Sequence, residues 1–473
     1  MTTLHLPIDR ASRIPIYRQI YDGLRQAILD GVLHPGQKVP STRALAEELE
    51  VSRLPVLTAY EQLLHECYLE GRLGSGTFVS AALPDHLLRS PAPAHRRGRI
   101  RPPPAARDYG GLGPFRTSLP ALDQFPQAVW ARLVARHAHT MTRAQMAYGD
   151  PAGVAALRDA IAEHLRAARG VRCEAEQVLV VSGSQAALRV TAAVLLARGD
   201  GVAMEEPGYP GARAALTAGG ARAIPVAVDE EGLRVSTLRT RGAMRAVYVT
   251  PSHQYPLGMS MTAARRLELL DWASRQNAWI LEDDYDSDYR YVSRPLGALQ
   301  GMDTQARVIY IGSFSKVLFP ALRIGYVVVP PSLVPRFADA RASLDLFSPT
   351  LYQLALAEFL REGHFARHVR RMRGVYMKRR EALLTGLARH CAEWLSVYNA
   401  DAGLHVTVLL ARGINDDNLV ARMAARRLTA TALSACYAGR ARQQGLLLGF
   451  GGSTERRLLE ATRILSEIST PWR

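Results

Sequence analysis

The pattern of apolar positions divides the chain into segments of different character. From residue 15 to residue 30, isoleucine, leucine and alanine recur every three or four positions, which is the spacing of a helix with one buried face. Ser41 and Ser52 stand where helix N-caps are expected, each before a further helical segment. Two short strand-like segments then flank the turn LGSG, which favours a hairpin. Three helices followed by a hairpin predict a winged helix-turn-helix over residues 1–80.

From Asp108 onward, helical segments alternate with short runs that are apolar throughout. Such runs are typical of strands buried on both faces of a parallel sheet, so we expect an α/β domain with a mainly parallel sheet over 108–473. The last part, from about Pro349 to Arg473, mixes helices with strands such as LHVTVLL and LLLGF and predicts a smaller α/β lobe. The apolar runs are VLVVS (178–182), GVAME (201–205), AVYVT (246–250), WILED (279–283), VIYIG (308–312) and GYVVV (325–329).

The segment between these two patterns, residues 81–107, contains six prolines and six arginines and shows no periodicity. Proline-rich stretches of this kind form partly extended linkers. We therefore expect a winged helix at 1–80, a linker at 81–107 and the α/β domain at 108–473.

The chain of 473 residues has a formal net charge of +16, but the charge is not concentrated in the predicted winged helix. Residues 1–80 contain eight Lys and Arg against nine Asp and Glu, whereas residues 81–107 have a net charge of +5 and the rest of the chain +12. Contacts with nucleic-acid phosphates would therefore depend on a few placed arginines and on helix N-termini. A general preference for arginine is the alternative explanation of the excess charge.

The composition also argues against several classes of protein. The four cysteines are far apart and form no CxxC pair, so we expect neither a metal site nor a disulfide framework. No apolar run approaches the roughly 18 residues of a membrane span. The N-terminus lacks the pattern of a signal peptide. We expect a cytoplasmic protein with no metal and no membrane partner.

The most informative residue for chemistry is Lys316. Of 59 Lys and Arg, only Lys38, Lys316 and Lys378 are lysines. An arginine cannot be deprotonated and cannot form a Schiff base, whereas a desolvated lysine can. Lys316 lies in GSFSKVLFPALRIGY, with a serine one and three residues before it and Arg323 seven residues after it. This arrangement suits an aldehyde cofactor that carries a phosphate.

The N-terminal segment resembles the winged-helix domain of the GntR family of bacterial transcription regulators. The match includes PGQKVPSTRALAEEL, the VSR at the start of the recognition helix and the GSGTFV of the wing. The resemblance implies that the helix starting at Ser52 enters the major groove of operator DNA, that Arg53 reaches a guanine edge, and that Arg43 and Arg72 grip phosphates. The alternative is that these arginines are solvated surface. Pro55 stands where the family usually has a threonine, which changes the expected set of contacts.

Residues 108–473 resemble fold-type I aminotransferases, and the fusion as a whole resembles the MocR-type regulators, a GntR subfamily. The resemblance implies pyridoxal 5′-phosphate as the cofactor, bound as a Schiff base to Lys316. It also implies a phosphate site and a homodimer, in which a tyrosine from one subunit reaches the phosphate held by the other. The phosphate partners would be the backbone amides of Ser184 and Gln185 at a helix N-terminus, Ser313, Arg323 and the tyrosine of the neighbouring subunit, Tyr148.

The same resemblance assigns residues to the ring of the cofactor. Asp283, in LEDDYDSDY, would keep the pyridine nitrogen protonated. Asp284 is the alternative, and we expect it to be exposed. Tyr285 is expected on the same side as Asp283, because side chains in an extended strand repeat every two residues. Its hydroxyl would then contact the 3′-oxygen of the cofactor. Tyr209, in EEPGYPG, would stack on the ring, the alternative being an ordinary turn residue.

Two positions depart from the aminotransferase pattern. Tyr255, in PSHQYPLG, replaces the asparagine that usually contacts the cofactor oxygen, and His253 becomes an effector candidate at the edge of the site. The arginine that usually holds the substrate carboxylate corresponds to Gly445. Arg440 and Arg442 are nearby effector candidates; either one of them substitutes, or no carboxylate is held in the usual way.

These observations predict a transcription regulator whose partners are operator DNA and a small-molecule effector, the effector being the cofactor itself, an amine or an amino acid. RNA polymerase is a further partner that the resemblance allows. The first alternative is a functional aminotransferase with a DNA-binding appendage. Residual half-reactions of transamination are compatible with either hypothesis. A third hypothesis, an aminotransferase fold kept as an empty dimerisation scaffold, conflicts with the intact set of cofactor residues.

Overall fold

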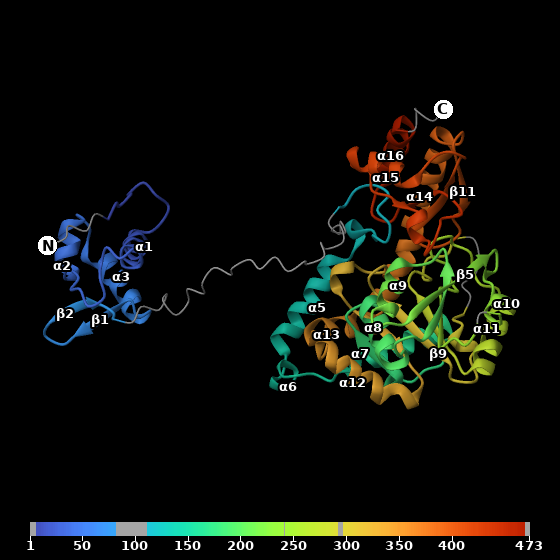
Figure 1. Ribbon diagram of the computed structural model, residues 1–473, viewed down its shortest axis with the longest axis horizontal. Helices are drawn as coiled ribbons and strands as arrows, with labels where there is room; N and C mark the ends of the chain where they lie inside the picture. The colour runs from blue at the N-terminus through green and yellow to red at the C-terminus, as the bar shows by residue number, and fades with distance from the viewer. Residues whose placement is uncertain (1–5, 82–110, 241, 292–296, 469–473) are drawn as a thin grey trace. The chain divides into compact units, whose positions relative to one another are not determined.

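The computed structural model describes residues 6–81, 111–240, 242–291 and 297–468. The chain forms two compact units, Met1–Arg107 and Asp108–Arg473 (Figure 1). Each unit is described by itself.

The N-terminal unit consists of three helices and a two-stranded antiparallel hairpin, as the sequence predicts for a winged helix-turn-helix. Its core is formed by the buried faces of the helices and by Tyr68, Leu69 and Val79 of the hairpin region. The elements are α1 (Ile16–Leu29), α2 (Thr42–Glu48), α3 (Arg53–His65), β1 (Leu69–Arg72) and β2 (Gly76–Val79).

The second unit is built on an eight-stranded sheet with the order β3-β10-β9-β8-β7-β4-β5-β6. The five strands from β9 to β5 pair in parallel, whereas β10 is antiparallel to both of its neighbours and β6 forms an antiparallel edge. The mainly parallel sheet is thus confirmed. The strands are β3 (Val178–Val181), β4 (Gly201–Glu206), β5 (Arg222–Asp229), β6 (Gly232–Leu233), β7 (Ala246–Val249), β8 (Trp279–Asp284), β9 (Val308–Ser313) and β10 (Gly325–Val328).

Helices cover both faces of this sheet, because successive strand residues point to opposite faces. On β3, Leu179 and Val181 pack with α8, α9 and α12, whereas Val178 and Val180 pack with α5, α7 and α13 on the other face. The helices of this part are α5 (Gln127–Thr140), α6 (Arg143–Met146), α7 (Ala155–Arg169), α8 (Ser184–Leu195), α9 (Pro210–Thr217), α10 (Val235–Leu238), α11 (Ala263–Gln276), α12 (Val334–Asp345) and α13 (Thr350–Arg361).

The C-terminal part carries a four-stranded antiparallel sheet with the order β11-β12-β14-β13. An earlier segment of the chain crosses to it: Phe115 bridges Gly449, and the amide of Ala121 donates a hydrogen bond to the Tyr376 hydroxyl at 3.0 Å. The elements are α14 (His364–His390), β11 (Leu395–Asn399), β12 (His405–Leu410), α15 (Asp416–Ala425), β13 (Thr431–Ala432), β14 (Gly445–Gly449) and α16 (Glu455–Ile468).

None of the described helices is long and apolar enough to cross a membrane. Short 3₁₀ helices complete the fold. They are η1 (Leu122–Gln124), η2 (Ala175–Gln177), η3 (Gln300–Met302), η4 (Pro320–Leu322), η5 (Pro331–Leu333) and η6 (Ser434–Cys436).

Candidate functional site

The strand order brings the predicted phosphate residues together. Strand β10 lies between β3 and β9, and its first residue, Gly325, is paired with Val181 on one side and Ser313 on the other. Arg323, two residues before Gly325, donates a hydrogen bond from Nη2 to the carbonyl of Ser182 at 2.5 Å. A cation therefore lies beside the loop that opens α8.

The N-terminus of α8 faces the same place. Gly183 precedes the helix with a φ of 92°, and a Cβ there would lie 3.3 Å from the guanidinium of Arg323. The first amides of a helix, here those of Ser184 and Gln185, have no partner within the helix, and the helix dipole makes this end favourable for an anion. Helix amides, Arg323 and the nearby hydroxyl of Ser313 fit a phosphate group.

Lys316 follows β9 and is half-buried. Its Nζ donates a hydrogen bond to the carbonyl of Ser118 at 3.1 Å. Burial lowers the pKa of Lys316 from 10.5 to about 8, and the carboxylates of Asp286 and Asp283 oppose this decrease. More of the amine is therefore neutral near physiological pH, which is the form that attacks an aldehyde.

Asp283, at the end of β8, is buried, and burial raises its pKa to about 6. Its Oδ2 accepts a hydrogen bond from the Tyr248 hydroxyl at 2.7 Å, whereas its Oδ1 is buried without a partner. A buried acceptor without a partner is costly unless a ligand supplies the donor. A protonated pyridine nitrogen is a donor of this kind, so the residues present fit the cofactor.

The expectation that Asp284 is exposed is wrong. Asp284 is buried, and its Oδ2 lies 2.8 Å from Nε of Arg169 and 2.5 Å from the Tyr310 hydroxyl. Neighbouring side chains on a strand point to opposite faces, so Asp284 turns away from Asp283 into a buried ion pair. The pKa of Asp284 is held below its usual value despite the burial, chiefly because of Arg169.

Three tyrosines lie close together in this region. The Tyr209 hydroxyl accepts a hydrogen bond from Nε2 of Gln185 at 3.2 Å, which ties Tyr209 to the start of α8. Its ring packs edge to face on Tyr255, with 5.4 Å between centroids, and Tyr255 packs in the same way on Tyr285 at 6.1 Å. A Cβ on Gly211 would lie 2.5 Å from the Tyr209 ring, so glycine is needed there for this ring position.

His253 is buried beside Tyr285. Its Nδ1 lies 3.0 Å from Oδ1 of Asp286 and 2.9 Å from the Tyr285 hydroxyl. Sequence reasoning missed Asp286, although it directly follows Tyr285 in the same motif. It also missed Glu205, a buried carboxylate that accepts hydrogen bonds from Thr250 and whose pKa is raised by burial to about 7.

The predicted effector arginines do not join this group. Arg440 and Arg442 are exposed, and none of their contacts that the structure records reaches Lys316. Gly445 is buried at the start of β14, where a Cβ would lie 2.4 Å from the carbonyl oxygen of Val408, so a side chain has no room there. Tyr148 is 85% exposed, and its ring contacts Phe347.

An apolar cluster lies beside Tyr255. It joins the loop after β7 to the sheet of the C-terminal part, and it includes Leu447, which is paired with Thr407 across β14 and β12. The Thr407 hydroxyl in turn donates a hydrogen bond to the carbonyl of Pro256 at 2.5 Å. The buried members of the cluster are Leu257, Met259, Leu433, Cys436, Tyr437 and Leu447.

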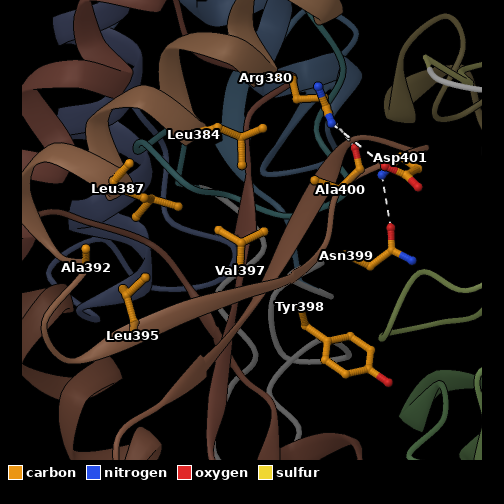
Figure 2. A pocket seen from close by; sticks show the side chains of 11 residues that line it. Arg380, Leu384, Leu387, Ala392, Leu395, Val397, Tyr398, Asn399, Ala400 and Asp401 are labelled. Carbon is orange, nitrogen blue, oxygen red and sulfur yellow. Dashed lines mark hydrogen bonds and ion pairs between the residues drawn. The ribbon is translucent and has the colours of Figure 1, made fainter.

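A groove of about 630 Å³ lies between α14 and β11 (Figure 2). None of the residues that line it belongs to the group around Lys316. At one end, a Cβ on Gly258 would lie 3.4 Å from Cβ of Asn399, so the groove ends close to the loop that carries His253. The lining includes Arg380, Leu384, Leu387, Leu395, Val397, Tyr398, Asn399 and Asp401.

The recognition helix of the winged-helix unit begins in an unusual way. Ser52 occupies the N-cap position of α3, but its hydroxyl makes no capping hydrogen bond. An N-cap oxygen normally accepts from the second or third amide of the helix, and the third residue is Pro55, which has no N–H. Arg53 is exposed, and its Nε donates a hydrogen bond to the hydroxyl of Thr42 at 3.2 Å.

The other two predicted phosphate contacts already have acidic neighbours. Arg43 lies 3.5 Å from Glu47, and both side chains are exposed. Arg72 lies 2.7 Å from Glu70, and its guanidinium is 4.5 Å from the centre of the Phe78 ring. Surface ion pairs of this kind are weak, so either arginine can exchange its carboxylate for a phosphate.

Both parts of the chain match known families. Residues 16–79 match the model for bacterial regulatory proteins of the gntR family, and residues 119–445 match the model for aminotransferase class I and II.

Relatives that match over nearly the whole length are named as regulators. The chain is 40% identical to the probable rhizopine catabolism regulatory protein MocR of Rhizobium meliloti, over 97% of this chain and 95% of that protein. It is 34% identical to the HTH-type pyridoxine biosynthesis transcriptional regulator PdxR of Corynebacterium glutamicum, over 95% of this chain and 94% of that protein.

Similar solved structures are aminotransferases. The kynurenine aminotransferase of Pyrococcus horikoshii has a TM-score of 0.71 and 27% identity, over 76% of this chain and 90% of the enzyme. The α-aminoadipate aminotransferase LysN of Thermus thermophilus, solved with N-(5′-phosphopyridoxyl)-L-leucine, has a TM-score of 0.70 and 29% identity, over 76% of this chain and 92% of the enzyme. This chain thus belongs to the MocR-type subfamily of GntR-family transcription regulators, in which a winged helix-turn-helix is fused to a fold-type I aminotransferase domain.

Proposed function

We propose that this regulator binds pyridoxal 5′-phosphate at Lys316 and senses either the cofactor itself or an amine that reacts with it. The observation that carries the proposal is the buried Oδ1 of Asp283, which has no partner and lies in the same group of residues as Lys316. When bound, the cofactor supplies an aldehyde and a ring that withdraws electrons. Lys316 would hold the aldehyde and Asp283 the ring nitrogen.

The remaining predicted residues have supporting positions. Arg323 and the first amides of α8 would hold the phosphate, with Ser313 nearby. Tyr209 and Tyr285 would contact the ring and its oxygen. The apolar cluster around Leu447, and the absence of room for a side chain at Gly445, favour an effector whose carboxylate, if it has one, is not held at that position.

The winged helix would bind operator DNA through the N-terminus of α3. Ser52 supports this role because its hydroxyl takes no part in capping, and Arg53 because it is exposed at the first turn. Thr42 steadies the guanidinium of Arg53 from α2, which limits how it approaches a base.

The protein would act as a homodimer. Tyr148 is 85% exposed, and its ring contacts Phe347. Met146, close to Tyr148 in the sequence, and Leu344 and Leu346, close to Phe347, are more than half exposed. In a dimer, Tyr148 would be available to the phosphate site of the partner subunit, as the resemblance implies.

An aminotransferase activity is the second candidate function. Lys316, Asp283 and the phosphate residues are also what a transaminase needs, and solved enzymes share this fold. The lack of an arginine at Gly445 and the presence of Tyr255 favour slow turnover, because an unanchored substrate seldom aligns its Cα–H bond with the cofactor.

The visible absorption spectrum of the purified full-length protein tests the proposal. We expect a band in the near-visible region after addition of pyridoxal phosphate, and its loss in Lys316→Ala. Lys378→Ala is the control, since Lys378 is an exposed lysine on α14. An unchanged band in Lys316→Ala would refute the assignment.

A further inference from the structure

A buried histidine–carboxylate pair beside the Lys316 group has no role in the proposed function. Nδ1 of His253 lies 3.0 Å from Oδ1 and 3.1 Å from Oδ2 of Asp286, and it also lies 2.9 Å from the Tyr285 hydroxyl. His253 and Asp286 are both buried. One ring nitrogen therefore contacts a carboxylate and a hydroxyl at the same time.

We infer that His253, held by Asp286, is a positioning residue that directs the Tyr285 hydroxyl toward the ring oxygen of the cofactor beside Lys316. The inference rests on the proposed function, because it requires the cofactor in this site. It replaces the expectation that His253 contacts the effector.

The reason lies in the hydrogen-bonding capacity of the three groups. An ionised carboxylate only accepts, so Asp286 favours the form of His253 in which Nδ1 carries a proton. That nitrogen then has no lone pair with which to accept the Tyr285 proton. The Tyr285 oxygen therefore accepts a hydrogen bond from this N–H, together with Asp286. The Tyr285 hydroxyl proton is then available to be donated to another acceptor. Carboxylates orient histidines in metal sites in the same way.

The neighbouring polar side chains of His405 and Arg290 have hydrogen-bond partners other than His253. His405, whose ring centre lies 5.3 Å away, donates from Nε2 to the carbonyl of Pro256 at 3.2 Å, and burial lowers its pKa to about 4, so it stays neutral. Arg290 donates hydrogen bonds to the carbonyl of Ser252 and to Ser260, both at 2.9 Å. The charged groups that act on Asp286 are thus Arg290, Lys316 and the carboxylate of Asp283.

A tight turn closes the pair off. A Cβ on Gly403 would lie 2.2 Å from Cε1 of His253 and 2.4 Å from Oδ2 of Asp286, so only glycine allows this approach. The turn is braced by two hydrogen bonds, from the amide of Asp401 to Oδ1 of Asn399 at 3.0 Å and from Arg380 to the carbonyl of Ala400 (Figure 2). The pair is therefore enclosed and held in one arrangement.

The test compares two variants of His253 in the full-length protein loaded with pyridoxal phosphate. His253→Leu removes the N–H, whereas His253→Asn keeps an amide N–H close to the position of Nδ1. A hydroxyl that donates to the ring oxygen stabilises its negative charge and so favours loss of the proton shared with the lysine nitrogen. We expect the pH midpoint of the absorption change to rise by about one unit in His253→Leu, a tenfold change in proton affinity, and to stay near the wild-type value in His253→Asn.

A double variant separates positioning from a structural effect. If His253 acts through the Tyr285 hydroxyl, Tyr285→Phe raises the midpoint and His253→Leu adds nothing to it. Additive shifts, or an unmoved midpoint in His253→Leu, would overturn the inference. Should His253→Leu fail to fold, His253→Gln, which places its amide one carbon further out, serves in its place with the same expected shift.

A measurement without cofactor distinguishes failure of the inference from failure of the proposed function. The chain has only three lysines, so protein labelled with ¹³C at lysine Cε gives a simple spectrum in which Lys316 is identified with Lys316→Arg. Loss of the N–H removes a hydrogen bond to the carboxylate of Asp286, which then stabilises the charged form of Lys316 more strongly. The pKa of Lys316 should therefore rise in His253→Leu and not in His253→Asn. No movement would contradict the inference. A wild-type protein that takes up no pyridoxal phosphate would instead contradict the proposed function.

Discussion

At the scale of single residues, the site depends on how burial changes the proton affinity of Lys316 and Asp283. Lys316 is shifted toward its neutral form, and Asp283 is left with an acceptor atom that has no partner. Both features are costly in a folded chain without a ligand, which is why such groups mark functional sites. The same burial on the other face of β8 produces only the Arg169–Asp284 ion pair, because there each charge has its partner.

The lowered pKa of Lys316 predicts the pH dependence of cofactor uptake. Only the neutral amine attacks an aldehyde, so the rate should rise with pH through a midpoint of about 8 and level off above it. With a lysine of the ordinary pKa, 10.5, the rate would still be rising at the upper end of the pH range. Stopped-flow absorbance between pH 6 and 10 measures this, and Lys316→Ala, which should show no such phase, provides the baseline. A midpoint near 10 would show that Lys316 is not desolvated.

At the scale of elements, two helix N-termini differ in what surrounds them. Helix α8 opens on Gly183 beside Arg323, an arrangement suited to a small phosphate. Helix α3 opens on Ser52, whose hydroxyl is not used for capping because Pro55 supplies no amide. In the proposed function, the same local physics, unpaired amides at a helix start, would serve cofactor binding in one unit and DNA binding in the other.

Arginine variants of the winged helix test which contacts read sequence. Arg53→Ala should weaken binding to the operator by about 1–3 kcal/mol and binding to random DNA much less, because a base contact is lost. Arg43→Ala is the matched variant: a phosphate contact is expected there, so both DNAs should lose affinity alike. Fluorescence anisotropy at fixed salt measures both. Equal losses on the two DNAs in Arg53→Ala would show that Arg53 contacts the backbone only.

At the scale of the whole molecule, a site able to hold a reactive cofactor is joined to a DNA-binding unit. Ligands at the two sites influence each other only if each binds one arrangement of the protein better than another. The coupling is reciprocal, so an effector that weakens DNA binding is itself bound more weakly in the presence of operator.

The balance between sensing and catalysis is open to direct measurement. We expect little multiple-turnover transamination with common amino acids, because no side chain fits at Gly445 to hold a carboxylate. Saturation with pyridoxal phosphate or a responsive amine should change operator affinity by about 1–3 kcal/mol, the usual range of allosteric coupling. Turnover of several per second together with unchanged DNA binding would identify the chain as an enzyme with a DNA-binding appendage.

The proposed dimer would bring Tyr148 of one subunit to the cofactor site of the other. If Tyr148 reaches the phosphate held by the partner subunit, Tyr148→Phe should leave the oligomeric state unchanged and weaken cofactor binding by about 0.5–1.5 kcal/mol, the net value of one hydrogen bond. Light scattering gives the oligomeric state and a spectral titration gives the affinity. A monomeric wild-type protein that binds the cofactor tightly would contradict the shared site.

The sequence by itself determined the elements and the chemistry of single residues. Apolar periodicity predicts the winged helix and six strands of the large sheet, and the scarcity of lysine points to Lys316. It did not predict β5, because RAIPVAVD alternates and contains a proline, as befits a strand near the sheet edge.

Tertiary structure decided which of the polar residues meet. Asp283 and Asp284 are neighbours in the chain, yet the pleat sends one toward Lys316 and the other into an ion pair with Arg169, more than a hundred residues away. Asp286 and His253 come together only because β7 and β8 are adjacent and a later turn packs on both. A sequence pattern describes only how residues are spaced along the chain. Which side chains are buried, and which partners they meet, depends on segments that are far apart in the sequence.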